Sequence, residues 1–157
     1  MKLRRINSTD LEQISSIESR CYSKNLIESK QRFKRLIDVY PKGCYGVEVE
    51  GKLIAYIFFL PWKRGSVLKL NDPTLELPDN PDCMYIHDLA VNPKFRGRGI
   101  ARRLVGHALN IFSRREYQVI NLVAVQKSET FWAKFGFRPV TEISYGGERA
   151  IFMELLL

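Results

Sequence analysis

The feature that most constrains the fold is a strand, a glycine-containing turn and a helix that follow one another directly. The apolar run 84–91 predicts a strand, which the Asn-Pro pair at 92–93 closes. Gly97 and Gly99 then precede a segment, 100–112, whose apolar residues recur at helical spacing. A helix of this kind must bury its apolar face against another layer, so we expect a domain that mixes helices with a sheet.

The rest of the chain extends this pattern. Periodicity and turn residues predict strands at 4–6, 45–49, 53–60, 119–125, 139–144 and 150–155, a helix opened by a capping box at 9–12, and helices at 29–39 and 129–135. The segment 62–82 is rich in Pro, Asp and Asn and predicts a long loop. No repeat or linker divides the chain, so we expect residues 1–157 to form a single α/β (α+β) domain with a mixed sheet.

Composition excludes several classes of protein. With 45% hydrophobic and 27% charged residues, the chain matches globular proteins. Its longest apolar run, 53–60, is too short to cross a bilayer, and no apolar region follows the basic N-terminus, so a cytoplasmic location is expected. Cys21, Cys44 and Cys83 are scattered and only two histidines occur. This pattern disfavours a disulfide framework or a zinc site, and we expect no bound metal.

The formal charge of +8 predicts an anionic partner of some kind. Nucleic acid, membrane headgroups and a phosphate-bearing cofactor all satisfy that condition. Most Lys and Arg residues are dispersed, which disfavours a nucleic-acid or membrane surface, whereas residues 94–103 carry five of them. The charge therefore directs attention to the turn between the predicted strand and helix.

That turn has the properties of a pyrophosphate site. The residues from Arg96 to Ala101 lie at the N-terminus of the predicted helix, where backbone N–H groups lack intrahelical partners. Glycines allow an anion to approach these amides closely. A P-loop is excluded because no Lys-Ser or Lys-Thr follows Gly99, and a dinucleotide fingerprint is disfavoured because Arg102 stands where a small residue is needed. A turn with solvated arginines is the alternative.

Three motifs in order resemble the GNAT superfamily of N-acetyltransferases. Arg96-Gly97-Arg98-Gly99-Ile100-Ala101 matches the R/Q-x-x-G-x-G/A signature of these enzymes. The string from Tyr85 to Pro93 resembles their fourth strand, and Phe131 to Phe137 resembles a later motif, F/L-Y-x-K-x-G-F. The likeness spans nearly the whole chain and is most specific from Tyr85 to Ala101.

The resemblance implies a mixed, splayed central sheet flanked by about four helices and an acetyl-CoA cosubstrate. It implies that pantetheine binds the backbone of the fourth strand, with the Leu89 N–H directed at the thioester oxygen, and that the amides from Gly97 to Arg102 hold the pyrophosphate. The cofactor-binding residues that follow from the resemblance are Leu89, Ala90, Val91, Arg96, Gly97, Arg98, Gly99, Ile100, Ala101, Arg102 and Trp132.

His87 is the natural candidate for the catalytic base, because an ammonium acceptor must lose a proton before it attacks a thioester. Its position matches one of two catalytic histidines in arylalkylamine N-acetyltransferases, and Tyr85 occupies the position of the other. A structural histidine bonded to the backbone or to Asp88 is the alternative. Trp132 stands where the family has its usual general-acid tyrosine, so Tyr145, Tyr85 or water is expected to supply that proton.

Strand alternation predicts which side chains share the site. It assigns Tyr85, His87, Leu89 and Val91 to one face of the strand, with Ile86, Asp88 and Ala90 on the other.

The acceptor is expected to be a small primary amine, either an arylalkylamine or a polyamine. Trp62, Tyr85 and Tyr145 would line its pocket with aromatic rings. The alternatives are a protein N-terminus or lysine as acceptor, a non-catalytic acyl-CoA-binding module, and a small RNA-associated basic domain. Dimers are common in the family, and a homodimer is one assembly that the resemblance allows.

Overall fold

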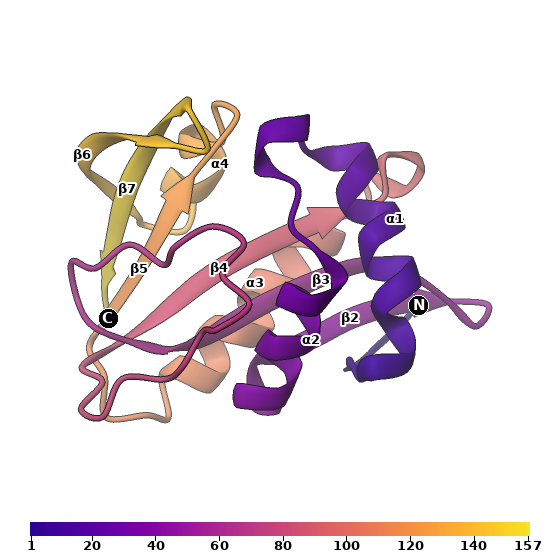
Figure 1. The fold of residues 1–157 in the computed structure, drawn as a ribbon, viewed down its shortest axis with the longest axis horizontal. Helices are drawn as coiled ribbons and strands as arrows, with labels where there is room; N and C mark the ends of the chain where they lie inside the picture. Colours follow the sequence, from indigo (N-terminus) through magenta and orange to yellow (C-terminus); the bar gives the residue numbers. More distant parts are fainter.

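The computed structural model describes residues 1–157 as a seven-stranded sheet with helices on both faces (Figure 1). In chain order the strands and helices are β1 Lys2–Arg5, α1 Leu11–Cys21, α2 Lys30–Val39, β2 Cys44–Val49, β3 Lys52–Trp62, β4 Cys83–Val91, α3 Ile100–Phe112, β5 Val119–Ala124, α4 Glu129–Ala133, β6 Arg138–Tyr145 and β7 Glu148–Leu156. The predicted elements are therefore all present, with ends that differ by a few residues. None of the helices is long and apolar enough to cross a membrane.

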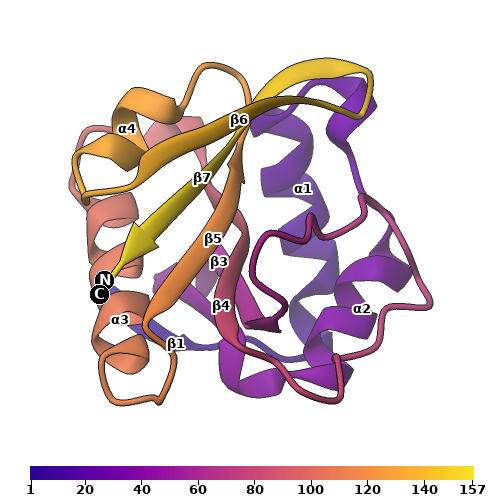
Figure 2. The same cartoon turned by 90° about the vertical axis from the view of Figure 1, so that its left-hand side faces the viewer.

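The sheet is mixed, as predicted, with strand order β1-β2-β3-β4-β5-β7-β6. All neighbouring strands are antiparallel except β4 and β5, which are parallel. Helices α1 and α2 cover one face of the sheet, whereas α3 and α4 cover the other (Figure 2). The sheet therefore separates two apolar cores, and a site that involves residues from both faces must pass through it.

Strand β3 is buried on both faces, and its alternation divides its side chains between the two cores. Tyr56 and Phe58 pack under α1 and α2, whereas Ile57 and Phe59 pack toward α3. A strand covered on both sides reads as a continuous apolar run, which is why the segment 53–60 contains no polar residue.

The N-terminal capping box lies two residues earlier than predicted. The Asn7 side chain accepts from the Thr9 N–H, and the Asp10 carboxylate accepts from the Asn7 N–H, so the reciprocal pair is Asn7 with Asp10. A single 3-10 turn, Ser8–Asp10, then leads into α1. Arg4 donates two hydrogen bonds to the Asp10 carboxylate and explains this choice of cap.

The prediction that β4 alternates regularly is wrong, because the strand contains a bulge at His87. Phe58 pairs with Asp88 and Phe59 pairs with Ile86, so His87 has no direct partner on β3. The extra residue shifts the alternation by one position. His87 and Asp88 consequently share the α1 face of the sheet, whereas the same rule had separated them.

The bulge also separates residues that the prediction had grouped. Tyr85 and Ala90 pack in the core under α1 and α2. Leu89 and Val91 pack instead against the core under α3. The side chains after His87 thus lie on the faces opposite to those expected from simple alternation, whereas Tyr85 and Ile86 lie on the faces expected.

Candidate active site

A cavity of about 460 Å³ lies where β4 and β5 separate. The two strands pair only from Met84 to Ile86 and from Ile120 to Leu122, after which they diverge. The cavity lining is mainly apolar and comes from both faces of the sheet: Tyr22, Glu28, His87 and Tyr145 on the α1 side, with Ala101, Phe131 and Trp132 on the α3 side. The gap between the strands therefore forms a passage through the sheet.

We call the part of this cavity that lies under α1 the α1-side chamber. Its lining residues are Tyr22, Leu26, Glu28, Leu70, Tyr85, His87, Asp88 and Tyr145. The chamber contains carboxylates, phenols and one imidazole among apolar walls, which is a suitable environment for proton transfer.

The backbone of β4 presents a free edge to the gap. The Asn92 N–H donates to Ile54 O on β3, and hydrogen-bonded residues alternate along an antiparallel pair. Leu89 and Val91 therefore direct their N–H and C=O groups away from β3 and toward β5. An extended amide-containing chain that entered the gap would find backbone N–H donors there, while the carbonyl oxygens of Leu89 and Val91 already accept from the Tyr22 hydroxyl and the Cys21 thiol.

The turn after β4 leads directly to the start of α3. Gly97 and Gly99 have φ angles of 79° and 77°, which side chains rarely tolerate, and a Cβ built on either residue meets no atom within 4 Å. Gly99 is the N-cap of α3, so the first N–H groups of that helix face open space. The Arg98 guanidinium lies 5.0 Å from the centroid of the Phe95 ring beside this turn.

These features fit a coenzyme A molecule. The open space over the glycines and the free N–H groups at the start of α3 suit a pyrophosphate. The free edge at Leu89 and Val91 suits the two amides of pantetheine. Of the residues predicted to bind the cofactor, Leu89, Ala90, Val91, Arg96, Ala101 and Trp132 line the cavity, and the rest lie in the adjacent turn and first turn of α3.

His87 is paired with a carboxylate that lies far away in the sequence. Its Nε2 lies 2.6 Å from Oε1 of Glu28, and each side chain is only 3% exposed. Glu28 lies in the connection between α1 and α2 and is separated from His87 by 59 positions. Burial alone would raise the pKa of Glu28, but the adjacent His87 and Arg32 lower it below its usual value.

A fully buried arginine supports this pair and the loop before β4. Arg32 on α2 lies 3.3 Å from Oε2 of Glu28, and its two terminal nitrogens donate to the carbonyls of Lys69 and Asp72. The Asn71 N–H also donates to Oε2 of Glu28. We call residues 63–82 the strap. Its middle is therefore hydrogen bonded to the same charged group that contacts His87.

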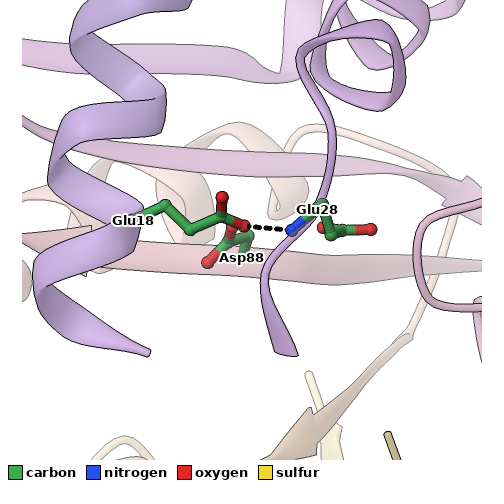
Figure 3. Close-up of side chains that lie close together, drawn as sticks. All are labelled: Glu18, Glu28 and Asp88. Atoms are coloured by element: carbon green, nitrogen blue, oxygen red, sulfur yellow. Dashed lines mark hydrogen bonds between the residues drawn. The ribbon is translucent and has the colours of Figure 1, made fainter. Parts of the chain in front are cut away.

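Two further carboxyl groups lie beside Glu28. Figure 3 shows Glu18 on α1 and Asp88 on β4 close to it, with the Glu28 N–H donating to Oε2 of Glu18. One oxygen of each carboxyl lies within 4.8 Å of the other two. Burial raises the pKa of Glu18 to about 8, and it raises the pKa of Asp88 to about 6. Glu18 and Asp88 together therefore hold a proton at neutral pH.

The cluster formed by Glu18, Glu28 and Asp88 does not offer a metal ion a free set of oxygen ligands. The oxygens of Glu28 are already bound by His87, Arg32 and the Asn71 N–H, and those of Asp88 accept from two phenols. A cation would have to displace these donors. The cluster is better suited to storing and moving protons.

Tyr22 connects Asp88, a member of the carboxyl cluster, to the backbone edge of β4. Its hydroxyl lies 2.8 Å from Oδ1 of Asp88 and 2.6 Å from the carbonyl oxygen of Leu89. Tyr56 donates to the other oxygen of Asp88. Burial raises the pKa of Tyr22 well above its usual value, and the Asp88 charge raises it further, so the phenol stays protonated.

The two tyrosines predicted as catalytic both contact the strap. Tyr145 donates to the carbonyl of Leu68 at 2.8 Å, and Tyr85 accepts from the N–H of the same residue. Both line the cavity, but their hydroxyls already have backbone partners. Trp62, which was expected to complete an aromatic lining, does not line the cavity and packs against the core under α1 and α2.

Trp132 lies between the cavity and the core under α3. It is 7% exposed, and its ring lies 5.0 Å from that of Phe131 and 5.6 Å from that of Phe137, measured between centroids. This aromatic cluster forms the wall of the cavity on the α3 side.

Sequence reasoning missed three residues of the site and misplaced a fourth. Glu18, Tyr22 and Glu28 come from α1 and the connection that follows it, and no motif distinguishes them from other surface-type residues. Asp88 was assigned to the wrong face of β4 because a bulge has no reliable signal in one sequence. The negative charge of the chamber comes from these buried carboxyl groups.

Comparison with known proteins agrees with this geometry. Part of the chain is similar to an L-2,4-diaminobutyric acid acetyltransferase from Vibrio parahaemolyticus, with 31% identity over 58 residues, or 37% of this chain and 32% of that relative. The match thus spans about a third of the relative.

Solved structures share the fold at low identity. The loading GNATL domain of CurA from Lyngbya majuscula superimposes with a TM-score of 0.85 at 15% identity, over 99% of this chain and 96% of that one. The PaiA N-acetyltransferase from Thermoplasma acidophilum, solved in complex with coenzyme A, gives 0.74 at 16% identity, over 99% and 98%. A profile described as the Acetyltransferase (GNAT) family matches residues 11–137. The chain therefore belongs to the GNAT family of acetyltransferases, a family of acyltransferase enzymes.

Proposed function

We propose that the protein is an acetyl-CoA-dependent N-acetyltransferase that acetylates a small primary amine by direct attack in a ternary complex. The observation that carries the proposal is the buried His87–Glu28 pair, which lies in a passage beside the free edge of β4. Residues 1–157 act in this proposal as one catalytic domain.

The residues of the gap support acetyl-CoA as the cosubstrate. The N–H groups at the start of α3 and the glycines before it would bind the pyrophosphate, with Arg96 and Arg98 adding positive charge. Leu89 and Val91 would hydrogen-bond pantetheine through their backbone. Two solved relatives of the same fold bind coenzyme A or isobutyryl-CoA, which supports this assignment.

His87 is the proposed base. An alkylammonium with a pKa of about 10.4 is protonated at neutral pH and must lose a proton before its nitrogen attacks. The imidazole would take that proton, and the Glu28 carboxylate at 2.6 Å would stabilise the imidazolium that forms. The same contact keeps the ring oriented toward the chamber.

The backbone of β4 provides the remaining stabilisation. The Leu89 N–H points into the gap and is placed to donate to the thioester oxygen as negative charge develops on it. Because β4 is paired with β3 from Asp88 to Val91, on both sides of this residue, the donor is held in place before the substrate binds. Tyr85 and Tyr145 would line the acceptor side and hold the strap over it.

The acceptor is proposed to be small and to carry no carboxylate. The turn between β6 and β7 packs on the connection after α1: a Cβ on Gly146 would lie 2.8 Å from Asn25 O and 3.0 Å from Leu26. A peptide would have to separate these segments. Both terminal nitrogens of Arg32, which pairs with Glu28, donate to carbonyls of the strap, and the Glu28 and Asp88 carboxylates would repel an acid. Arylalkylamines and polyamines satisfy both conditions.

The test is acetyl-CoA-dependent thiol release over a panel of arylalkylamines, polyamines, amino acids and short peptides. Turnover of a small amine supports the proposal, and a preference for peptides would favour a protein N-terminus or lysine instead. No thiol release with any member of the panel, with acetyl-CoA still raising the melting temperature, would favour a non-catalytic acyl-CoA-binding module. Silence with no stabilisation would refute the proposal.

A further inference from the structure

The proposed reaction needs a proton donor for the leaving thiolate, for which the sequence suggested Tyr145, Tyr85 or water. When the C–S bond breaks, the thiolate of coenzyme A must be protonated. Trp132 occupies the position where the family's tyrosine was expected, and its indole does not serve as an acid. The Tyr145 hydroxyl donates its proton to the Leu68 carbonyl, whereas the Tyr85 hydroxyl accepts from the Leu68 N–H. Both hydroxyls are therefore engaged at the strap, and a phenol beside the β4 backbone is a further candidate for the donor.

The Tyr22 hydroxyl is the phenol that lies against the backbone where the thioester is expected. It is 2.6 Å from the carbonyl oxygen of Leu89. The N–H of the same residue is proposed to donate a hydrogen bond to the thioester oxygen. Tyr22 also lines the cavity. One phenolic proton faces two acceptors here, the Leu89 carbonyl and the Asp88 carboxylate, so that proton can be redirected without breaking the structure.

Two carboxyl groups that can share a proton, Asp88 and Glu18, lie next to this hydroxyl. Asp88 accepts from both Tyr22 and Tyr56, and the Glu18 carboxyl lies within 4.8 Å of it. The second oxygen of Glu18, Oε1, is buried without any hydrogen-bond partner. An unpaired buried oxygen is costly for a carboxylate but much less so for a protonated carboxyl group. Both carboxyl groups have raised pKa values, which agrees with a shared proton.

We propose that Tyr22 is the general acid that protonates the departing thiolate, and that Asp88 and Glu18 return the proton to it. The inference rests on the proposed acetyl transfer. As the C–N bond forms and the C–S bond breaks, the electron pair stays on sulfur and takes the Tyr22 proton. Asp88 is a carboxylate at rest, so it takes the proton of the Glu18 carboxyl and passes it to the phenolate, and solvent then reprotonates Glu18. The proton of the amine goes separately to His87.

The charges around this relay come from four elements. Facing it are Glu18 and Cys21 of α1, Glu28 of the following connection, Tyr56 of β3, and His87 of β4. Because the carboxyl groups outnumber the nearby cations, the pair retains its proton up to mildly alkaline pH. Asp88 and Glu18 are positioning residues in this scheme, since neither touches the substrate.

The first test is Tyr22→Phe, with Tyr117→Phe as the matched control outside the cavity. For an amine that the wild type acetylates, we expect kcat to fall about a hundredfold in Tyr22→Phe, as for loss of general-acid catalysis. The KM for the amine should change little, and the control should keep wild-type kcat. Wild-type kcat in Tyr22→Phe would overturn the proposal.

A second test needs no acceptor and separates chemistry from folding. Coenzyme A and desulfo-coenzyme A differ only in the sulfur atom that Tyr22 is proposed to contact. The wild type should bind coenzyme A about fivefold more tightly at pH 8, the value of roughly one ordinary hydrogen bond. Tyr22→Phe should bind both alike. A preference that survives in Tyr22→Phe would overturn the proposal, even where turnover has been lost.

The carboxyl pair is tested by Glu18→Gln, which keeps the acceptor for the Glu28 N–H but removes the proton store. The alkaline limb of the wild-type kcat profile should disappear in this variant or move by at least one pH unit. If the pH profile of kcat in Glu18→Gln coincides with that of the wild type, Glu18 takes no part in the relay. If the wild type acetylates no amine, the proposed function fails, whereas the two-ligand comparison still decides whether Tyr22 contacts the sulfur.

Discussion

His87 Nε2 lies 2.6 Å from Oε1 of Glu28, and this contact joins a bulged strand to the connection between two helices. The bulge leaves His87 without a partner on β3, so the residue is free to turn into the chamber. Glu28 is held from the other side by Arg32 and by the strap. The proposed base is therefore positioned by segments that are distant in the sequence.

Removing the charge of Glu28 should slow the reaction and also lower stability, because the buried Arg32 guanidinium loses its charged partner. Glu28→Gln still accepts from the Asn71 N–H but no longer stabilises an imidazolium. We expect kcat to fall by about tenfold, by analogy with loss of a residue that supports a catalytic histidine. Steady-state kinetics measure the effect. Glu12→Gln, an exposed residue paired with Lys30, is the control, and equal activity of Glu28→Gln and this control would contradict the account.

The glycines before α3 should matter for the cosubstrate. Gly99→Ala puts a side chain on a residue with φ of 77° and fills the space above the first amides of the helix. We expect coenzyme A affinity to fall by about tenfold, or about 1.4 kcal/mol, measured by titration calorimetry. Gly106→Ala lies on the exposed side of the same helix and should bind normally while raising stability by about 0.5–1 kcal/mol. Normal affinity in Gly99→Ala would refute this assignment.

The sequence predicted the fold and the cofactor side of the site for a physical reason. Gly97, Gly99 and the apolar periodicity of α3 are local signals, so the turn and helix can be recognised from neighbouring residues alone. Strand β3 could also be predicted, because both of its faces are buried and its sequence is therefore a continuous apolar run. Each of these features depends on contacts that are short in sequence or on a regular repeat.

The other side of the site depends on long-range packing, and prediction failed there. Glu28 meets His87 only because the connection after α1 folds over the end of β4. Asp88 reaches Tyr22 only because a bulge moves it to the other face. The function of Tyr22 was invisible for the same reason, since nothing in its neighbours along the chain indicates the Leu89 carbonyl.

The raised pKa of Glu18 predicts how stability depends on pH. Burial lifts this pKa from 4.5 to about 8, so the folded state holds a proton that the unfolded state releases. Stability should consequently fall as pH rises from about 4.5 to about 8 and then level off. Glu18→Gln has no such proton, and its advantage over the wild type should grow across this window to on the order of 5 kcal/mol. Urea unfolding at several pH values tests this, and a constant difference would contradict it.

Arg32 should be the most costly charge to remove. Its side chain is fully buried, and it donates to Lys69 O and Asp72 O of the strap while compensating Glu28. Arg32→Met should destabilise the protein by about 3–5 kcal/mol, as for loss of one partner of a buried pair. Lys34→Met removes an exposed partner of Asp38 and should cost at most about 0.5 kcal/mol. A similar, small loss for both variants in chemical denaturation would show that Arg32 does not support the strap.

The measurement that tests the central claim most directly compares two acceptors that differ only in a carboxylate. Acetyl-CoA-dependent thiol release is followed with 2-phenylethylamine and with phenylalanine, and the acetylated product is identified in each case. The apolar, acidic chamber predicts turnover of the amine and at least tenfold lower kcat/KM for the amino acid, because the carboxylate meets Glu28 and Asp88 without a free cation. Equal or better turnover of the amino acid would contradict the proposed acceptor class. No release from any amine, together with no binding of acetyl-CoA, would contradict the account itself.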